Sequence, residues 1–203
     1  MFYEVIYSDC PWRYSFPRTQ KNGGCTYPTM STKELCELPI GKIAAQNSVL
    51  FQWATGPKLT DALKVMEAWG FPCKTFAFNW VKTNKRNGDF YSGLGSYTCS
   101  NAELCLVGRR GKGLKRINKT VKQTVVAPIG RHSAKPLTVR RRIELLYGNV
   151  PRIELFAREC SIGWTCLGNE IDGKDIRDAL TEIIQKIEQR PNLMEMRRGT
   201  KIA

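Results

Sequence analysis

The chain has 203 residues, of which 42% are hydrophobic, and a formal net charge of +14. This length suits one α/β domain, or one domain with a short appendage. The apolar runs are too short to cross a bilayer, and the chain start lacks the basic and apolar regions of a signal peptide. We therefore expect a cytoplasmic protein without membrane contact, whose polyanionic partner is nucleic acid.

Cysteine usage predicts neither a metal site nor a disulfide framework. No two of the eight cysteines form a C-x-x-C pair, and the chain has a single histidine. Structural zinc sites usually show such close ligand pairs. We expect reduced thiols at Cys10, Cys25, Cys36, Cys73, Cys99, Cys105, Cys160 and Cys166.

In the first half of the chain, strands are predicted where β-branched and aromatic residues gather: residues 3–8, 49–53, 75–81 and 102–107. Ser31 and Glu34 form a capping box that opens a short helix, which ends by Pro39. A second helix is indicated by residues that share one face at helical spacing, with Gly70 as its stop: Leu59, Ala62, Leu63 and Met66.

The second half continues the alternation of helices and strands. A helix face made by Val139, Ile143, Leu146 and Tyr147 ends at Gly148. Residues 152–157 are predicted as a strand. A last amphipathic helix presents Ile176, Leu180, Ile183, Ile184 and Ile187, and stops at Pro191.

This alternation predicts an α/β fold with a doubly wound, mostly parallel sheet. We assign residues 1–172 to one domain. Residues 173–203 are expected to be a C-terminal helix and basic tail, packed on or extending from that domain. Ligands of such sheets bind at the carboxyl ends of the strands.

Three segments do not follow the pattern: residues 13–26, 82–98 and 108–123. Each combines basic side chains with glycines or aromatics. Long loops inside a compact domain are usually functional, although a solvated surface is the simpler alternative. Basic and aromatic side chains together suit backbone phosphates and unstacked bases.

The tetrapeptide Asp9-Cys10-Pro11-Trp12 directly follows the first predicted strand. The N6 amino group of adenine is a poor nucleophile because its lone pair is delocalised into the ring. The Asp9 carboxylate and the Cys10 carbonyl could accept its two hydrogens, while Pro11 stiffens the turn and Trp12 stacks on a flipped-out base. The alternative is a strand-ending aspartate followed by a turn and a core tryptophan.

Further motifs occur along the chain in an order that resembles the MT-A70 family. This family includes the catalytic subunit of the eukaryotic messenger-RNA N6-adenosine methyltransferase and many small bacterial and phage proteins. The matching segments cover roughly residues 3–172: 9–12, 27–31, 50–55, 80–84, 101–108, 132–136, 154–158 and 163–170. The resemblance implies a Rossmann-like methyltransferase fold with a permuted motif order, and S-adenosylmethionine as the methyl donor.

The resemblance also implies which residues hold the methyl donor. Lys135 would meet the methionine carboxylate, Asp9 would lie near the methionine amino group, and Arg158 would contact the cofactor from the end of a late strand. Asn169 and Glu170 would bond the ribose hydroxyls. Without the resemblance, an ion pair between Arg158 and Glu154 is the alternative reading.

The chain departs from the family pattern at two places. The tetrapeptide is usually Asp-Pro-Pro-Trp, so Cys10 replaces a proline but keeps the backbone carbonyl. Longer members carry an acidic residue upstream that contacts the adenine of the cofactor, and this chain begins too close to Asp9 to supply it. His132 could order the loop before Lys135 or contact substrate, and we assign it no role as a general base.

Adenine-N6 methylation of DNA is the leading hypothesis, with RNA as the alternative substrate, because the chain resembles the small bacterial and phage members. A catalytically silent nucleic-acid-binding subunit is the alternative from another class. The oligomeric state is open and includes a homodimer. Substrate contacts are predicted for Tyr27, Lys82, Asn84, Arg109, Arg110, Lys112 and Lys115, and core positions for Trp53, Trp69, Trp80 and Trp164.

Overall fold

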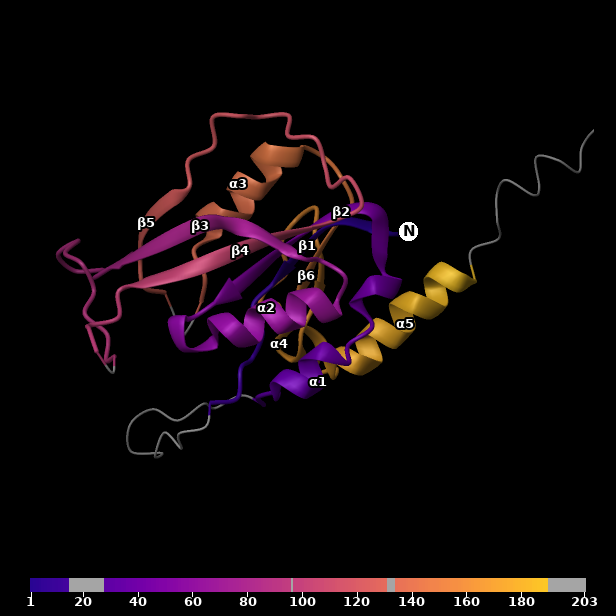
Figure 1. Ribbon diagram of the computed structural model, residues 1–203, viewed down its shortest axis with the longest axis horizontal. Coiled ribbons are helices and arrows are strands. Elements are labelled where there is room, and N and C mark those ends of the chain that lie inside the picture. The colour runs from indigo at the N-terminus through magenta and orange to yellow at the C-terminus, as the bar shows by residue number, and fades with distance from the viewer. Residues whose placement is uncertain (15–27, 96, 131–133, 190–203) are drawn as a thin grey trace, which may run out of the picture.

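The computed structural model describes residues 1–14, 28–95, 97–130 and 134–189. A seven-stranded sheet with the order β5-β3-β4-β2-β1-β6-β7 runs through this part of the chain (Figure 1). Its strands are β1 (Tyr3–Ser8), β2 (Ala44–Ala54), β3 (Cys73–Thr83), β4 (Ala102–Arg110), β5 (Thr124–Pro128), β6 (Arg152–Leu155) and β7 (Thr165–Leu167).

The sheet is mostly parallel, as predicted. Strand β1 pairs in parallel with β2 and β6, as do β3 with β5 and β6 with β7. Strand β4 is antiparallel to both of its neighbours, β2 and β3. Because β4 runs in reverse, it begins at the edge where β1 ends and finishes at the opposite edge.

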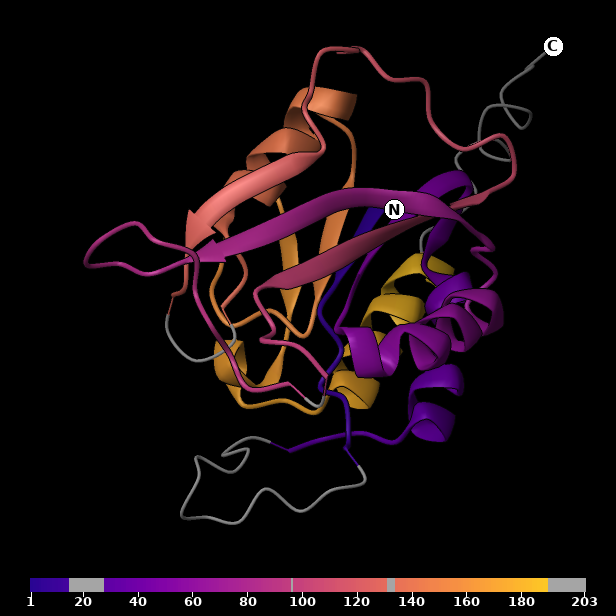
Figure 2. The same ribbon diagram turned by 60° about the vertical axis from the view of Figure 1, so that its left-hand side comes forward.

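Helices cover both faces of the sheet (Figures 1 and 2). One face carries α1 (Thr32–Cys36), α2 (Leu59–Ala68) and α5 (Ile176–Glu188), and the other carries α3 (Leu137–Tyr147). The short helix α4 (Asn169–Asp172) follows β7, and two 3-10 helices, η2 (Ile40–Lys42) and η3 (Gly56–Lys58), flank β2. The arrangement is that of a Rossmann-like, doubly wound α/β domain, as expected from the sequence.

The two faces of the sheet build two apolar cores. In β1, Ile6 packs in the core under α1, α2 and α5, while Val5 and Tyr7 pack in the core under α3. This alternation follows from the two-residue period of a strand. Helix α5 belongs to the first core, since its Ile176 and Leu180 side chains are buried there.

Local signals placed most helix ends correctly. Ser31 is the N-cap of α1 and forms the complete capping box with Glu34. Gly70 adopts φ +82°, and Gly148, with φ +68°, is the C-cap of α3. One assigned helix face was wrong in detail: Leu63 is 42% exposed, and Val65 takes the buried position beside Met66.

Two strands were not predicted. Strand β5 has a single buried residue, Val125, and β7 is three residues long with none. Among the helices of the described ranges, none has the length and apolar character needed to span a bilayer.

Candidate active site

The segment Asp9–Trp12 lies at the carboxyl edge of the sheet, directly after β1. It lines a cavity of about 320 Å³ together with residues from the ends of other elements. This volume is at the lower end of the roughly 300–1,000 Å³ typical of small-molecule sites. Lys135, Arg158, Asn169 and Glu170 line the same cavity, so the structure brings all predicted catalytic and cofactor residues together.

Backbone hydrogen bonds fix the shape of the Asp9–Trp12 segment. The Trp12 N–H donates to the Cys10 carbonyl oxygen at 2.9 Å, which closes a three-residue turn around Pro11. The Met30 N–H donates to the Pro11 carbonyl oxygen at 2.8 Å and pins the turn to the strand-like stretch before α1. The Cys10 carbonyl has a second lone pair and can still accept a hydrogen from a ligand.

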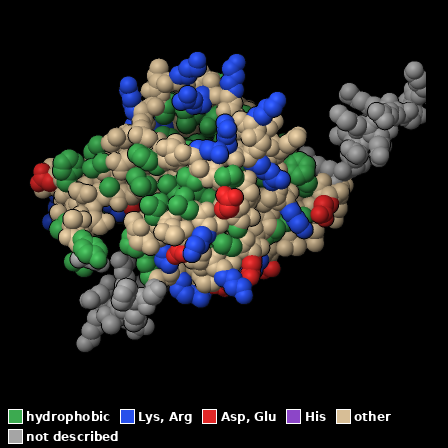
Figure 3. Space-filling view, viewed as in Figure 1, with side chains coloured by type: hydrophobic (Ala, Val, Ile, Leu, Met, Phe, Trp, Pro, Cys, Tyr) green, Lys and Arg blue, Asp and Glu red, His purple; other side chains and the backbone are tan. Residues whose placement is uncertain are grey.

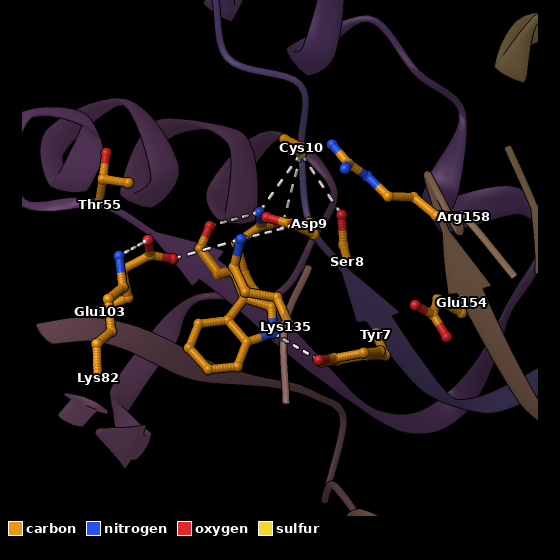
Figure 4. Close-up of polar contacts among 12 residues, drawn as sticks. Tyr7, Ser8, Asp9, Cys10, Thr55, Lys82, Glu103, Lys135, Glu154 and Arg158 are labelled. Atoms are coloured by element: carbon orange, nitrogen blue, oxygen red, sulfur yellow. Dashed lines mark hydrogen bonds and ion pairs between the residues drawn. The ribbon is translucent and has the colours of Figure 1, made fainter. Parts of the chain in front are cut away.

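A chain of charges connects three strand ends at the cavity (Figure 4). Nζ of Lys135 lies 2.8 Å from Oδ2 of Asp9 and 3.3 Å from Oε2 of Glu103. The other oxygen of Glu103, Oε1, lies 2.5 Å from Nζ of Lys82. Glu103 is placed there because antiparallel β4 begins at the edge where β1 and β3 end.

Burial and charge act in opposite directions on this chain. Burial raises the pKa of Asp9 above its ordinary value, and the Lys135 ammonium offsets only part of that effect. Burial alone would lower the pKa of Lys135, but the carboxylates of Asp9 and Glu103 raise it. For Glu103, burial is outweighed by Lys135 and Lys82, which lower its pKa. Lys135 is therefore a fixed cation, and Asp9 is a carboxylate that protonates more readily than a surface aspartate.

Cys10 cannot act as a thiolate nucleophile at neutral pH. Burial raises the pKa of its thiol to about 12, and Sγ lies 3.4 Å from Nε2 of the buried Gln52. Its side chain packs in the core, so the backbone carbonyl is the part of this residue that a ligand can use.

Trp12 contributes more to the core than expected. Its side chain is 6% exposed and packs among the residues buried between the sheet and the helices, with one edge at the cavity. Tyr14, which the sequence did not single out, is 43% exposed at the same cavity. Its hydroxyl lies 2.8 Å from Oγ1 of Thr55, and Nζ of Lys58 lies 5.4 Å from the centroid of its ring. Tyr14 is thus a more exposed aromatic side chain at the cavity than Trp12.

The other wall of the cavity begins where β6 ends. Phe156 has φ +59°, a left-handed conformation that costs a non-glycine residue roughly 1–2 kcal/mol. This turn brings Phe156 and Arg158 to the cavity. Nε of Arg158 lies 3.4 Å from Oε1 of Glu170, and Arg158 extends toward Asp9 and Cys10 (Figure 4). Glu154 pairs with Arg140, with Nε of Arg140 2.6 Å from Oε2 of Glu154.

Gly168 allows the two halves of this wall to approach closely. A Cβ at this position would lie 2.0 Å from the Ala157 carbonyl oxygen, so a larger residue would push β7 and α4 away from the end of β6. Asn169 and Glu170 follow at the start of α4 and reach the cavity because of this contact.

The donor set fits S-adenosylmethionine. Asp9 offers a carboxylate for an amino group, Lys135 and Arg158 offer cations for a carboxylate, and Asn169 with Glu170 offers polar atoms for ribose hydroxyls. Phe156, Met30 and Ile176 supply apolar surface in the same cavity. Asp175, the N-cap of α5, also lines it. Neither Asp175 nor Glu103 was predicted as a site residue.

The predicted substrate residues do not form one cluster. Lys82 belongs to the charge chain, while the Asn84 backbone forms a turn with Asp89 and Gly88 beside it. Arg109 and Arg110 end β4, roughly 25 Å from its start at about 3.4 Å per residue. Lys112 and Lys115 continue from that far edge, where basic side chains gather on the surface (Figure 3). Tyr27 and His132 lie outside the described residues.

Comparisons with known proteins identify the family of the chain. The sequence model of the MT-A70 family matches residues 3–170. A type II methyltransferase M.MunI from Mycoplasma sp. is 34% identical, over 86% of this chain and 80% of its own length. An N(6)-adenosine-methyltransferase MT-A70-like protein of Arabidopsis thaliana is 27% identical, and the human N(6)-adenine-specific methyltransferase METTL4 is 26% identical. Each match covers 83% of this chain, but only 24% and 37% of those longer relatives.

Proposed function

Since the chain belongs to the MT-A70 family and is an adenine-N6 methyltransferase acting on nucleic acid, we propose that its methyl donor is S-adenosylmethionine and its polymer is DNA. We assign catalysis to the Asp9–Trp12 segment. One observation carries this assignment: Asp9, Lys135, Arg158, Asn169 and Glu170 meet in one cavity at the carboxyl edge of the sheet.

Asp9 and the Cys10 carbonyl are the groups that hold the adenine amino group. Both are hydrogen-bond acceptors, and the N6 amino group offers two hydrogens. As N6 becomes tetrahedral, these acceptors stabilise the positive charge that develops on it. The N6 proton that is lost leaves through Asp9 or through solvent at the cavity mouth.

S-adenosylmethionine, when bound, supplies an electrophilic methyl group whose bond to sulfur breaks as the bond to N6 forms. The chain's own residues set the geometry. Lys135 and Arg158 are the cations for its carboxylate, and Asn169 and Glu170 are the partners for its ribose. By fixing both reactants, the cavity converts a bimolecular encounter into an oriented transfer.

Similarity over most of its length to a type II methyltransferase supports DNA as the polymer. The alternative substrate, RNA, is supported by the Arabidopsis thaliana relative, whose name gives adenosine as the methylated group. Both substrates would present an unpaired adenine to the same cavity.

The silent-subunit alternative has less support. A subunit without catalysis has no need to keep Asp9, Trp12, Lys135, Arg158 and Asn169, and all five line one cavity here. The test is incubation with S-adenosylmethionine and duplex DNA, single-stranded DNA or RNA, followed by mass analysis of nucleosides. N6-methyladenine from DNA supports the proposal, whereas nucleic-acid binding without detectable cofactor affinity supports the silent subunit.

A further inference from the structure

A small hairpin projects from the segment that joins β3 to β4. The N–H of Gly93 donates to the carbonyl of Ser100 at 3.0 Å, and the N–H of Ser100 donates back to Gly93 at 2.9 Å. Added Cβ atoms at Gly93 and Gly95 would lie 2.7 Å from the Ser100 carbonyl oxygen and 2.1 Å from that of Thr98. The described residues of the hairpin are thus held tightly together.

This hairpin exposes large apolar side chains. Leu94 and Tyr97 are 101% and 100% exposed, and Phe90 in the same segment is 65% exposed. An exposed apolar side chain by itself is ordinary. Two fully exposed ones on one short hairpin, with Phe90 in the same segment, place apolar surface together, and apolar surface that is gathered in one place marks interaction sites.

The position of the hairpin indicates what that partner is. Since β3 ends and β4 begins at the carboxyl edge, the hairpin leaves the sheet at the same edge as the cavity. Figure 2 shows the segment between β3 and β4 running down to the level of α4, which carries cavity residues. Glu103, one residue into β4, lines the cavity itself. Lys85 and Arg86 lie in the same segment and carry the charge that suits phosphates.

We propose that the hairpin closed by Gly93 and Ser100 is a wedge that inserts Leu94 and Tyr97 into duplex DNA beside the target adenine. The inference rests on the proposed function and adds the duplex as the form of substrate. Apolar side chains inserted between base steps unstack them, and this offsets the cost of moving a base into a cavity. The wedge is needed for a paired adenine and not for an unpaired one.

The test compares initial methylation rates of the wild-type chain and the double variant Leu94→Ala/Tyr97→Ala on one oligonucleotide in three forms. These forms are single-stranded, annealed to its complement, and annealed to a strand with an abasic position opposite each adenine. We expect the variant to lose about tenfold or more on the full duplex and to match wild type on the other two forms. Ile162→Ala, which removes another fully exposed apolar side chain (102%) at a different loop, is the control.

An unchanged ratio of duplex to single-strand rates overturns the wedge. Equal losses on all three forms also overturn it and indicate a contact with a protein partner or a second copy. If the wild-type chain methylates none of the three forms, the proposed function fails first, and the wedge fails with it.

Discussion

Asp9 and Lys135 are 126 residues apart in the chain, yet Oδ2 of Asp9 lies 2.8 Å from Nζ of Lys135. The contact joins the predicted catalytic segment after β1 to the predicted cofactor residue before α3. Glu103, near the start of the antiparallel strand β4, forms a second ion pair with Nζ of Lys135, at 3.3 Å. The proposed catalytic acceptor and the proposed cofactor cation thus belong to one electrostatic unit.

This unit predicts opposite pH effects of two substitutions. Asp9 must be ionised to accept the amino hydrogens, so methylation should fall as the pH drops through its raised pKa. Glu103→Gln removes a negative charge that raises the pKa of Asp9, so the acid limb should move to lower pH. Lys135→Gln removes the cation that lowers the pKa of Asp9, so the acid limb of the pH profile should move to higher pH. The measurement is the pH profile of kcat at saturating donor, and shifts in the same direction would refute the coupling.

Arg158→Ala should weaken S-adenosylmethionine binding about 10- to 100-fold, the range for a lost hydrogen bond to a charged group. Titration calorimetry measures this without catalysis. Arg177→Ala is the matched control, because Arg177 is an exposed arginine that pairs with Glu34 at 3.2 Å and does not line the cavity. Equal affinities of the two variants would remove Arg158 from the cofactor site.

Trp12→Ala should lower the free energy of unfolding by about 3–5 kcal/mol, because the side chain is buried in the core. Chemical denaturation measures this loss, and Trp12→Phe should retain most of the stability. If Trp12→Ala unfolds like wild type, the tryptophan serves the ligand and not the fold.

Tyr14→Ala should leave stability within about 0.5 kcal/mol, because the side chain is largely exposed. We expect KM for nucleic acid to rise while the affinity for the methyl donor is unchanged. Tyr14→Phe keeps the ring and removes only the contact with Thr55, so its KM should stay near that of wild type. A similar rise for both variants would assign the effect to the hydroxyl.

The basic far edge of β4 gives a prediction about salt. If a duplex runs from the cavity along the side of the sheet, substituting Arg109, Lys112 and Lys115 with alanine removes three phosphate contacts. The slope of log affinity against log salt should then flatten by about 2–3. Arg110 is left intact because its Nη1 donates to the Gly41 carbonyl at 2.6 Å. Removal of Lys64, Arg177 and Lys186 is the control, and equal slopes in both triple variants would place the contact surface elsewhere.

Much of the fold could be predicted because the periodic apolar residues of each helix or strand are followed by residues that mark its end. The capping box at Ser31 and the glycines at 70 and 148 mark helix ends through local chemistry. The direction of β4 could not be predicted, since an apolar run reads the same in a parallel or an antiparallel strand. Strand β5 was missed because Val125 alone is buried in it.

The residues of the candidate site that stand in short sequence motifs could be predicted. The Asp9 segment, Lys135 and Asn169 stand in recognisable motifs, and the structure places them at one cavity. Glu103 was missed because its role depends on the reversal of β4, which brings it between Lys82 and Lys135. The sequence left two alternatives for Trp12, a base-stacking ring and a core side chain, because the tetrapeptide alone does not show how deeply the ring is buried; the structure places it in the core.

The most direct test of the account is nucleoside mass analysis of DNA treated with S-adenosylmethionine and either the wild-type chain or Asp9→Asn. Asparagine keeps the shape of the side chain and removes the charge. We predict N6-methyladenine with the wild-type chain. With Asp9→Asn we expect the rate to fall by a factor of about 100 or more. Methylation of a different atom, or an undiminished rate in Asp9→Asn, would contradict the assignment of the carboxylate to the adenine amino group.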